Sequence, residues 1–347
     1  MSDEKNMVKN LHEVAKKVAI IGSGPSGLTA AIYTSRANIA TDIYLGDMPG
    51  GQLTTTTEIE NFPGFVDGID GPLLMENMQK QAQRFGANLI SESVTKLDYT
   101  NQNSNNASPT ITLTANTANG VIEKTYDAII IATGAKARYL GVKGEEVFIG
   151  KGYHTCATCD GFFYRNKTIA VVGGGDSAME EASYLAKLAS KVYVIHRSDN
   201  FKASKIMYDR AVNNPKIEFI TFKTVSSFIT EDKGFGAEFA GINLISTLKD
   251  GANSEEELKI DGLFVAIGHI PNSDFVSSLS LDKDEIGYLI SQQHIDPEFR
   301  VSNYNTATKL QGIFVAGDVE DKLYRQAITA AGDGCRAAME VEKYLEN

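Results

Sequence analysis

Two cysteines separated by two residues, Cys156 and Cys159, are the side chains of this sequence with the clearest capacity for chemistry. Such a pair can close a small disulfide, and a carboxylic acid beside the second cysteine, here Asp160, can give a proton to a leaving thiolate or take one back. The third cysteine, Cys335, lies among small residues and is expected to be buried in a helix. The spacing therefore predicts a redox-active pair with Asp160 as its acid–base partner.

A zinc site is the other common use of a close cysteine pair. Zinc takes four ligands, and only His154 lies near the pair, with no second pair of cysteines at this spacing. The ligand count disfavours zinc, so we expect no bound metal.

The composition limits the classes of protein to consider. The chain has 347 residues, enough for two domains, and its 33 basic and 44 acidic residues give a net charge of −11. An excess of negative charge disfavours nucleic acid and anionic membrane surfaces as partners. No apolar run approaches the roughly 20 residues of a membrane span, and residues 1–16 form a polar leader rather than a signal-peptide core. We therefore expect a cytoplasmic protein.

The first element that could position a cofactor is a glycine turn near the N-terminus. Residues 18–21 are expected to form a buried strand, 28–38 a helix and 41–45 the next strand, with GSGPSG between the first strand and the helix. In this context the GxGxxG pattern binds a dinucleotide, because it allows a tight turn and close approach of the backbone to a pyrophosphate at the helix N-terminus. The turn contributes Gly22, Gly24 and Gly27.

A second unit of the same type follows the cysteine pair. Residues 168–172 are expected to form a strand, 179–188 a helix and 191–196 the next strand, around the turn GGGDSA. The turn matches the related pattern GxGxxA through Gly173, Gly175 and Ala178. Two such units beside a cysteine pair suggest electrons moving between two cofactors and a disulfide.

The residues after the last strand of the second unit indicate which nucleotide binds there. Arg197 and Lys202 are cations, and no carboxylate stands at the strand end, which favours a ribose 2′-phosphate over a free 2′-hydroxyl. A solvated pair of surface charges is the alternative.

Further ligand contacts are expected from other loops. Three apolar strands end in glycine, within residues 126–134, 262–268 and 312–318, and parallel sheets meet their ligands at such carboxyl ends. Residues 50–57, with two glycines and four threonines, predict a loop with polar donors, and residues 72–86 predict an amphipathic helix.

Six motifs of this chain occur together and in a fixed order. They are GSGPSG, GGQLTTTTEIENFPGF, IIIATGAKARYLG, CATCDGFFY, GGGDSAMEEA and FVAGDVEDKLYRQAITAAGDGC. As a set they closely resemble the low-molecular-weight thioredoxin reductases, over nearly everything from Val18 to Leu345. The resemblance implies an α/β fold of two Rossmann-like dinucleotide-binding domains, the second inserted in the first. It further implies FAD in the first domain, NADPH in the second, thioredoxin as the protein substrate and a homodimer.

The order of the motifs divides the chain. Residues 1–140, with the polar leader, and 268–347 are expected to form the FAD-binding domain, and 141–267 the NADPH-binding domain that carries the cysteine pair. Nicotinamide and disulfide then share one domain, and each must reach the flavin in the other. The inserted domain is therefore expected to rotate between half-reactions, with hinges at 135–141 and 268–271.

The resemblance also implies roles for individual residues. Those expected at the FAD are Gly22, Gly24, Pro25, Gly27, Gly51, Gln52, Thr57, Asn61, Thr133, Gly134, Gly317, Asp318, Arg325, Gln326 and Ala327. Those expected at NADPH are Gly173, Gly175, Asp176, Ser177, His196, Arg197 and Lys202. The chain departs from the family at Ser198 and Lys202, where arginine is usual, and lysine lacks the planar fork that grips phosphate. A weaker preference for NADPH is the expected result.

By this resemblance, electrons pass from NADPH through FAD to the Cys156–Cys159 disulfide and on to oxidised thioredoxin. Cys159 is expected to face the flavin, with Asp160 as general acid and base. Two alternatives remain: a related flavin disulfide reductase that takes electrons from NADH or ferredoxin, and a flavoprotein redox sensor without turnover.

Overall fold

The computed structural model describes residues 16–347 apart from 57, 102–108, 118–119, 233–236 and 249–254. The polar leader expected from the sequence therefore lies outside the described residues except for Lys16. The chain divides into two compact units. Unit 1 contains the chain up to Lys136 and again from Ile270, and unit 2 is Ala137–His269.

Unit 1 is built on a parallel sheet of five strands in the order β18-β7-β1-β2-β3. The strands are β1 (Lys17–Ile21), β2 (Ala40–Tyr44), β3 (Asn88–Ile90), β7 (Ala128–Ile131) and β18 (Ile313–Val315). Strands β7 and β18 are buried along their whole length, as expected for a parallel sheet that is covered on both faces.

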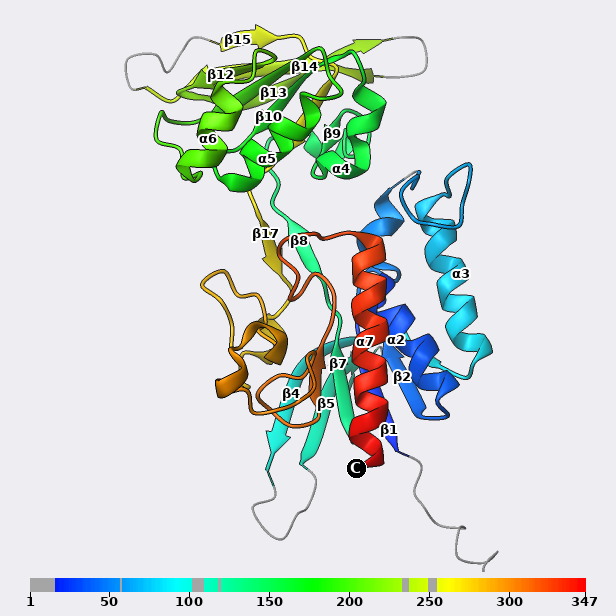
Figure 1. Cartoon of the computed structure of the whole chain (residues 1–347). Helices are drawn as coiled ribbons and strands as arrows, with labels where there is room; N and C mark the ends of the chain where they lie inside the picture. Colours follow the sequence, from blue (N-terminus) through cyan, green and yellow to red (C-terminus); the bar gives the residue numbers. More distant parts are fainter. Residues whose placement is uncertain (1–15, 57, 102–108, 118–119, 233–236, 249–254) are drawn as a thin grey trace, which may run out of the picture. The chain divides into compact units, whose positions relative to one another are not determined.

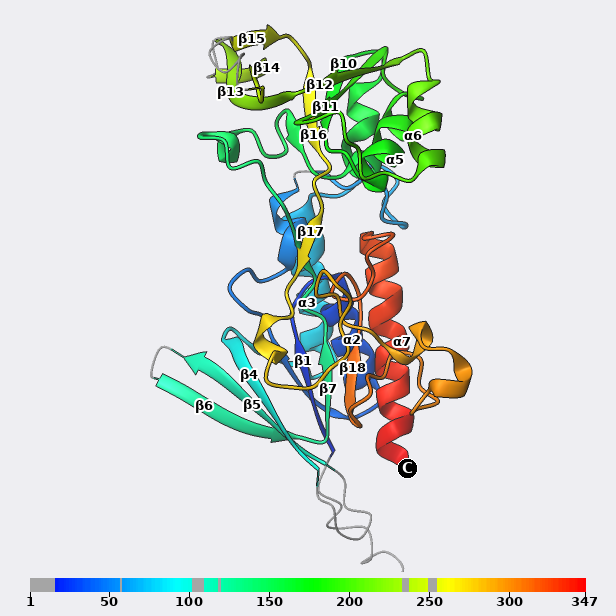
Figure 2. The ribbon, with the colours of Figure 1, turned by 90° about the vertical axis from the view of Figure 1, so that its left-hand side faces the viewer.

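Alternation of side chains along these strands separates two cores in unit 1, one on each face of the parallel sheet. The ribbon shows helices over one face of this sheet and antiparallel strands over the other (Figures 1 and 2). Ile20 and Ile130 lie in one core with the helices, while Ile21 and Ile131 lie in the other with an antiparallel sheet. The helices are α2 (Pro25–Arg36), α3 (Gly71–Arg84) and α7 (Ala327–Glu346). The antiparallel strands are β4 (Ser93–Thr100), β5 (Thr110–Thr117) and β6 (Gly120–Tyr126).

Unit 2 repeats this layered architecture (Figure 2). Its parallel sheet has the order β12-β11-β10-β16-β9. The strands are β9 (Tyr153–His154), β10 (Thr168–Val172), β11 (Lys191–His196), β12 (Ile217–Thr221) and β16 (Gly262–Val265). Helices α5 (Asp176–Leu185) and α6 (Lys205–Val212) cover one face, and the antiparallel strands β13 (Lys223–Asp232), β14 (Ala237–Ser246) and β15 (Glu255–Leu258) cover the other.

The chain passes between the units twice, along β8 (Ala135–Ala137) and β17 (His269–Pro271), which pair as a two-stranded sheet. The remaining elements are short: α4 (Ala157–Asp160) and the 3₁₀ turns η1 (Gly51–Thr55), η2 (Glu145–Val147), η3 (Gly161–Tyr164), η5 (Asp274–Val276), η6 (Gln292–His294) and η7 (Pro297–Phe299). The structure confirms the predicted α/β fold, with one Rossmann-like unit inserted in the other.

The loop predicted over residues 50–57 was wrong in part, because η1 is a 3₁₀ helix. Gly50 and Gly51 have φ angles of +94° and +68°, which glycine adopts without strain, and they turn the chain into the helix. The hydroxyls of Thr54 and Thr55 then donate to the carbonyls of Gly51 and Gln52, at 2.7 and 2.8 Å. These bonds satisfy the threonine hydroxyls within the turn, at positions where threonine propensity disfavours a helix.

Two further expectations need correction. Both helices that follow a glycine turn start three residues before the predicted start, at Pro25 and Asp176, because proline and aspartate suit a first helical turn. Cys335 lies in α7 as predicted, but it is half-buried rather than buried. The buried face of α7 passes through Gly334, Ala338 and Val341, and the Cys335 Sγ sits beside it, 3.9 Å from the sulfur of Met339.

Candidate functional site

The predicted cysteine pair forms a disulfide at the start of a short helix in unit 2. Cys156 and Cys159 are bonded, with their Cα atoms 5.3 Å apart. Cys156 caps α4, and its Sγ accepts a hydrogen bond from the backbone N–H of Cys159 at 3.2 Å. Cys159 is exposed and Cys156 half-buried, so a reaction partner can reach the bond. The prediction of a disulfide from the cysteine spacing is confirmed.

Asp160, the last residue of α4, contacts a buried histidine. Its carboxyl is 21% exposed, and Oδ2 lies 2.9 Å from Nδ1 of His154, whose side chain is 4% exposed. On the other side of the ring, His154 Nε2 lies 2.6 Å from the hydroxyl of Tyr164. Sequence reasoning considered His154 only as a metal ligand and missed this link. No local pattern could have revealed it, because it depends on α4 and η3 folding back against β9.

The first glycine turn lies in unit 1. Two of its positions require glycine because the backbone packs closely there, and a third leaves open space for a ligand. A Cβ on Gly22 would collide with the carbonyl oxygen of Ala132, and one on Gly27 with the carbonyl oxygen of Gly22. A Cβ on Gly24 would meet nothing within 4 Å. Gly24 caps α2, whose first turn starts at Pro25 and has no side-chain cap. The positive end of the helix is therefore open to an anionic group.

Asp318 follows the end of β18 and approaches the same turn. Gly317, with φ +77°, brings the chain so close that a Cβ there would lie 2.9 Å from Cβ of Ser26 in the first turn of α2. Asp318 keeps some exposure as a residue, but its Oδ1 is fully buried and has no hydrogen-bond partner among the described residues. Burial, reinforced by the charge of Asp321, raises the pKa of Asp318 to about 7. A buried acceptor of this kind fits a ligand hydroxyl.

Most of the other residues expected at the FAD gather around these two loops. A Cβ on Gly51 would lie 3.4 Å from Cα of Gly24, and Gln52 Nε2 donates to the carbonyl of Ala135. Thr133 Oγ1 donates to the carbonyl of Asn272 at 2.7 Å. Gly134, at φ +67°, has open space where a Cβ would be. Thr57 lies outside the described residues.

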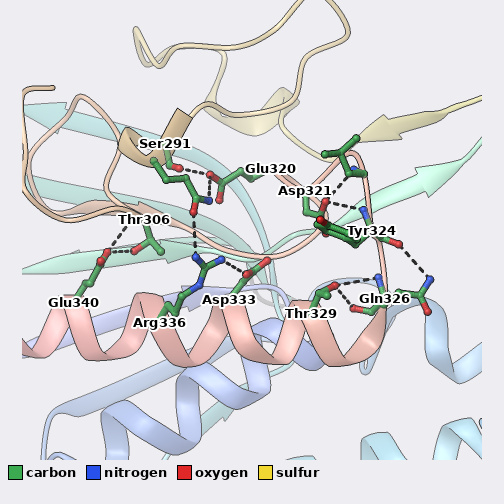
Figure 3. A network of polar contacts seen from close by, with 12 residues as sticks. Ser291, Thr306, Glu320, Asp321, Tyr324, Gln326, Thr329, Asp333, Arg336 and Glu340 are labelled. Atoms are coloured by element: carbon green, nitrogen blue, oxygen red, sulfur yellow. Dashed lines mark hydrogen bonds and ion pairs between the residues drawn. The ribbon is translucent and has the colours of Figure 1, made fainter. Parts of the chain in front are cut away.

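The segment before α7 is fixed by a polar network (Figure 3). The carboxyl of Asp321 accepts from the N–H groups of Leu323 and Tyr324, each at 2.9 Å, and from that of Arg325 at 3.1 Å. Gln326 caps α7 and exchanges hydrogen bonds with Thr329. These contacts hold Arg325 at φ +48° and present Ala327 at the start of the helix.

The predicted residue Asn61 meets this segment. Its Nδ2 donates to Gln326 Oε1 at 3.3 Å, across 265 positions of the sequence. The ends of β1, β7 and β18 thus bring together the expected residues from five stretches of the chain, at the carboxyl edge of one sheet.

The second glycine turn lies in unit 2 and likewise combines a closely packed glycine with one that leaves open space. A Cβ on Gly173 would collide with the carbonyl oxygen of Ala266 and would lie 2.8 Å from Cβ of Ala178, whereas a Cβ on Gly175 would meet nothing within 4 Å. Gly175 caps α5 without a side-chain cap, and Ser177 is exposed in the first turn of that helix. This turn is therefore also open to a phosphate.

The loop after β11 folds onto this turn. The backbone N–H of Lys202 donates to the carbonyl of Gly174 at 2.8 Å, and Asp176 Oδ1 accepts from the N–H of Ser204 at 2.6 Å. His196 packs its ring on Phe201, with centroids 4.7 Å apart. Arg197 and Lys202 are exposed, and neither forms an ion pair with the described residues. Both cations are thus available to an anionic ligand beside the turn.

The described residues lack the features of two other classes of site. No group of three or more His, Cys, Asp or Glu side chains in this part of the chain is placed to hold a metal ion. None of its helices is long and apolar enough to cross a membrane.

Comparison with known proteins finds relatives over nearly the whole chain. Residues 16–334 match the family model of the pyridine nucleotide-disulphide oxidoreductases. The chain is 46% identical to a protein of Pseudomonas fluorescens named glucosaminate ammonia-lyase, over 95% of this chain and 96% of that protein. It is 45% identical to the thioredoxin reductase of Escherichia coli O157:H7, with the same coverage. The solved thioredoxin reductase of Giardia duodenalis is 38% identical and covers 96% of this chain and 100% of its own, with a TM-score of 0.83.

Proposed function

Because this chain belongs to the pyridine nucleotide-disulphide oxidoreductases, and among them to the thioredoxin reductases, we propose that it reduces oxidised thioredoxin with electrons from NADPH that pass through FAD to the Cys156–Cys159 disulfide. The observation that carries the proposal is that disulfide, accessible at the start of α4 and followed directly by Asp160. The related protein named as a lyase shares the overall sequence. In this chain the redox pair favours disulfide reduction.

The loops at the carboxyl edge of the unit 1 sheet support FAD as the first cofactor. Gly24 leaves room for a pyrophosphate at the N-terminus of α2, and Asp318 supplies a buried acceptor for a hydroxyl of the ribityl chain. When bound, FAD accepts a hydride from a nicotinamide and passes two electrons to a disulfide. The protein supplies the binding, the orientation and the proton transfers.

The second turn and the cations beside it support NADPH as the electron donor. Gly175 leaves room for the pyrophosphate, and Arg197 and Lys202 can meet the charge of the 2′-phosphate. Ser198 has no charge to add, so the selectivity against NADH rests on two cations. NADH and ferredoxin are the alternative donors, of which NADH can be compared directly with NADPH.

The disulfide chemistry requires one proton transfer at each half-reaction. Two electrons break the bond between the sulfurs of Cys156 and Cys159 and would leave two thiolates. A proton from Asp160 converts one of them, at the neighbouring Cys159, into a thiol. The remaining thiolate then attacks the disulfide of thioredoxin, and the carboxylate of Asp160 takes the proton back when the second sulfur attacks in turn.

Two exposed phenylalanines are proposed to contact thioredoxin. Phe162 and Phe163 lie in η3, directly after the redox helix, and are 52% and 40% exposed. Exposed aromatic side chains beside a reactive group are frequent anchors for a protein partner. We further propose a homodimer in the cytoplasm, the compartment expected from three cysteines of which two are redox-active.

A single experiment tests the electron path. NADPH and, separately, NADH are added without oxygen to the purified yellow protein, the flavin absorbance is followed, and oxidised thioredoxin is added afterwards. We expect rapid bleaching by NADPH, slower bleaching by NADH, and return of the colour with thioredoxin. Failure of both nucleotides would contradict the assignment of unit 2 to a nicotinamide and direct the search to another donor. Failure of thioredoxin to restore the colour would contradict the proposed acceptor.

The proposed path requires unit 2 to rotate relative to unit 1. The disulfide and the second nucleotide turn both belong to unit 2, whereas the flavin loops belong to unit 1. The strands β8 and β17 carry both crossings and are the hinge candidates. Joining the two units by a covalent cross-link is expected to stop turnover with thioredoxin. Full turnover by a cross-linked protein would contradict the rotation.

A further inference from the structure

The proposed function uses Asp160 but gives no role to the buried histidine beside it. His154 lies on β9 with its ring stacked on Phe264, the centroids 5.1 Å apart at an interplanar angle of 27°. A histidine that is 4% exposed and touches two polar side chains has a fixed orientation. Such a residue can fix in turn the side chains that it contacts.

The two contacts of the ring determine where its proton lies. Nδ1 faces the Asp160 carboxyl at 2.9 Å, and a carboxylate only accepts. Burial and the charges of Asp160 and Asp261 raise the pKa of Tyr164, so its phenol stays protonated. We therefore assign the hydrogen to Nδ1, with Nε2 accepting from the Tyr164 hydroxyl at 2.6 Å. The Tyr164 hydroxyl then donates to His154, and the N–H group of His154 lies on the side of the ring that faces the Asp160 carboxyl.

Resting on the function proposed above, we propose that His154, backed by Tyr164, is a positioning residue that orients the Asp160 carboxyl and stabilises its ionised form during proton transfer with Cys159. When Asp160 gives its proton to the thiolate of Cys159, the new carboxylate lies against Nδ1–H. The carboxyl is 21% exposed, so water can reach it. The contact between Nδ1 and Oδ2 is at hydrogen-bond distance but not well aligned, as is frequent for catalytic hydrogen bonds in a resting state.

Two charged groups of the described residues, Asp261 and Lys167, lie at the Tyr164 end of this series. Asp261 acts on the Tyr164 hydroxyl, and the Lys167 ammonium lies 5.2 Å from the centre of the Tyr164 ring. Neither contacts the Asp160 carboxyl in a hydrogen bond or ion pair among the described residues. A pH effect that follows a change at His154 therefore reports on Asp160.

The test measures the ionisation of the reduced pair directly, without turnover. The protein is reduced, alkylated with iodoacetamide from pH 5 to pH 9, and the rate at Cys159 is read by mass spectrometry of its peptide. His154→Phe keeps an aromatic ring on Phe264 but removes both nitrogens. We expect the midpoint of its pH profile to rise by about one pH unit. The Asp160 carboxylate loses its donor in this variant, and its charge then disfavours the neighbouring Cys159 thiolate more strongly. We also expect turnover with thioredoxin to fall about 10-fold.

Two matched variants separate positioning from packing. His154→Asn keeps an N–H group toward Asp160, and its profile is expected to return close to that of the wild type. Tyr153→Phe is the control on the same strand: it removes the hydroxyl that donates to Glu145 at 2.9 Å and leaves Asp160 untouched, so its profile is expected not to move.

A profile of His154→Phe that coincides with that of the wild type would overturn the proposal. Should that variant not fold, Tyr164→Phe is expected to move the midpoint in the same direction by a smaller amount, and an unmoved midpoint there would overturn it as well. Alkylation requires neither thioredoxin nor NADPH. A wild-type protein that cannot reduce thioredoxin would therefore contradict the proposed function and leave this test standing.

Discussion

With either cysteine of the pair replaced by serine, turnover with thioredoxin is expected to fall by at least about 1,000-fold. The reason is chemical, since Cys156→Ser and Cys159→Ser each leave one sulfur, and one sulfur cannot accept two electrons by opening an intramolecular disulfide. The glycine turns do not involve these side chains. Bleaching of the flavin by NADPH, followed by stopped-flow absorbance, is therefore expected at the wild-type rate in both variants.

The third cysteine provides a matched control. Cys335→Ser makes the same change at a half-buried thiol of α7, in unit 1, and is expected to keep full turnover. Wild-type turnover in Cys156→Ser or Cys159→Ser would show that electrons leave the protein by another route. Loss of bleaching in either variant would show instead that the pair contributes to binding a cofactor.

Much of the fold could be predicted because its signals are local. The buried strands before each glycine turn and the helices after them follow from apolar runs and turn glycines, and the structure has them as β1, α2, β10 and α5. The 3₁₀ helix η1 could not be predicted in the same way. Its threonines disfavour a helix by propensity, and the bonds from their hydroxyls to the carbonyls of the preceding turn are seen only in the folded segment.

The candidate site was predictable to the extent that each residue lies in a recognisable motif. The disulfide follows from the spacing of Cys156 and Cys159, and the close backbone packing that requires glycine in each turn follows from the glycine patterns. The contact between His154 and Asp160 does not, because it depends on how α4 and η3 pack against a strand. Contacts of this kind are tertiary, so the sequence around a residue that makes such a contact gives no local signal of it.

Asp318 has the largest expected effect on stability, and the effect depends on pH. Burial raises its pKa from the ordinary 3.8 to about 7, so the folded protein holds this proton more tightly than the unfolded chain. In flavin-free protein this contribution to stability is fully present below about pH 4 and is lost as the pH rises to 7. The difference of about three pH units corresponds to about 4 kcal/mol.

The measurement is the free energy of unfolding of the flavin-free protein by urea, at pH 5 and at pH 8. Asp318→Asn is expected to flatten the pH dependence, because the amide has nothing to ionise, whereas Asp274→Asn, at an exposed position of the same unit, is expected to keep it.

Asp318→Ala is also expected to bind FAD about 10- to 100-fold more weakly, since it removes the acceptor proposed for a ligand hydroxyl. An unchanged pH dependence in Asp318→Asn would mean that the buried oxygen is not the group that titrates. Unchanged FAD affinity in Asp318→Ala would mean that the unpartnered oxygen is not a ligand contact, and the two results are independent because only one of them requires the flavin.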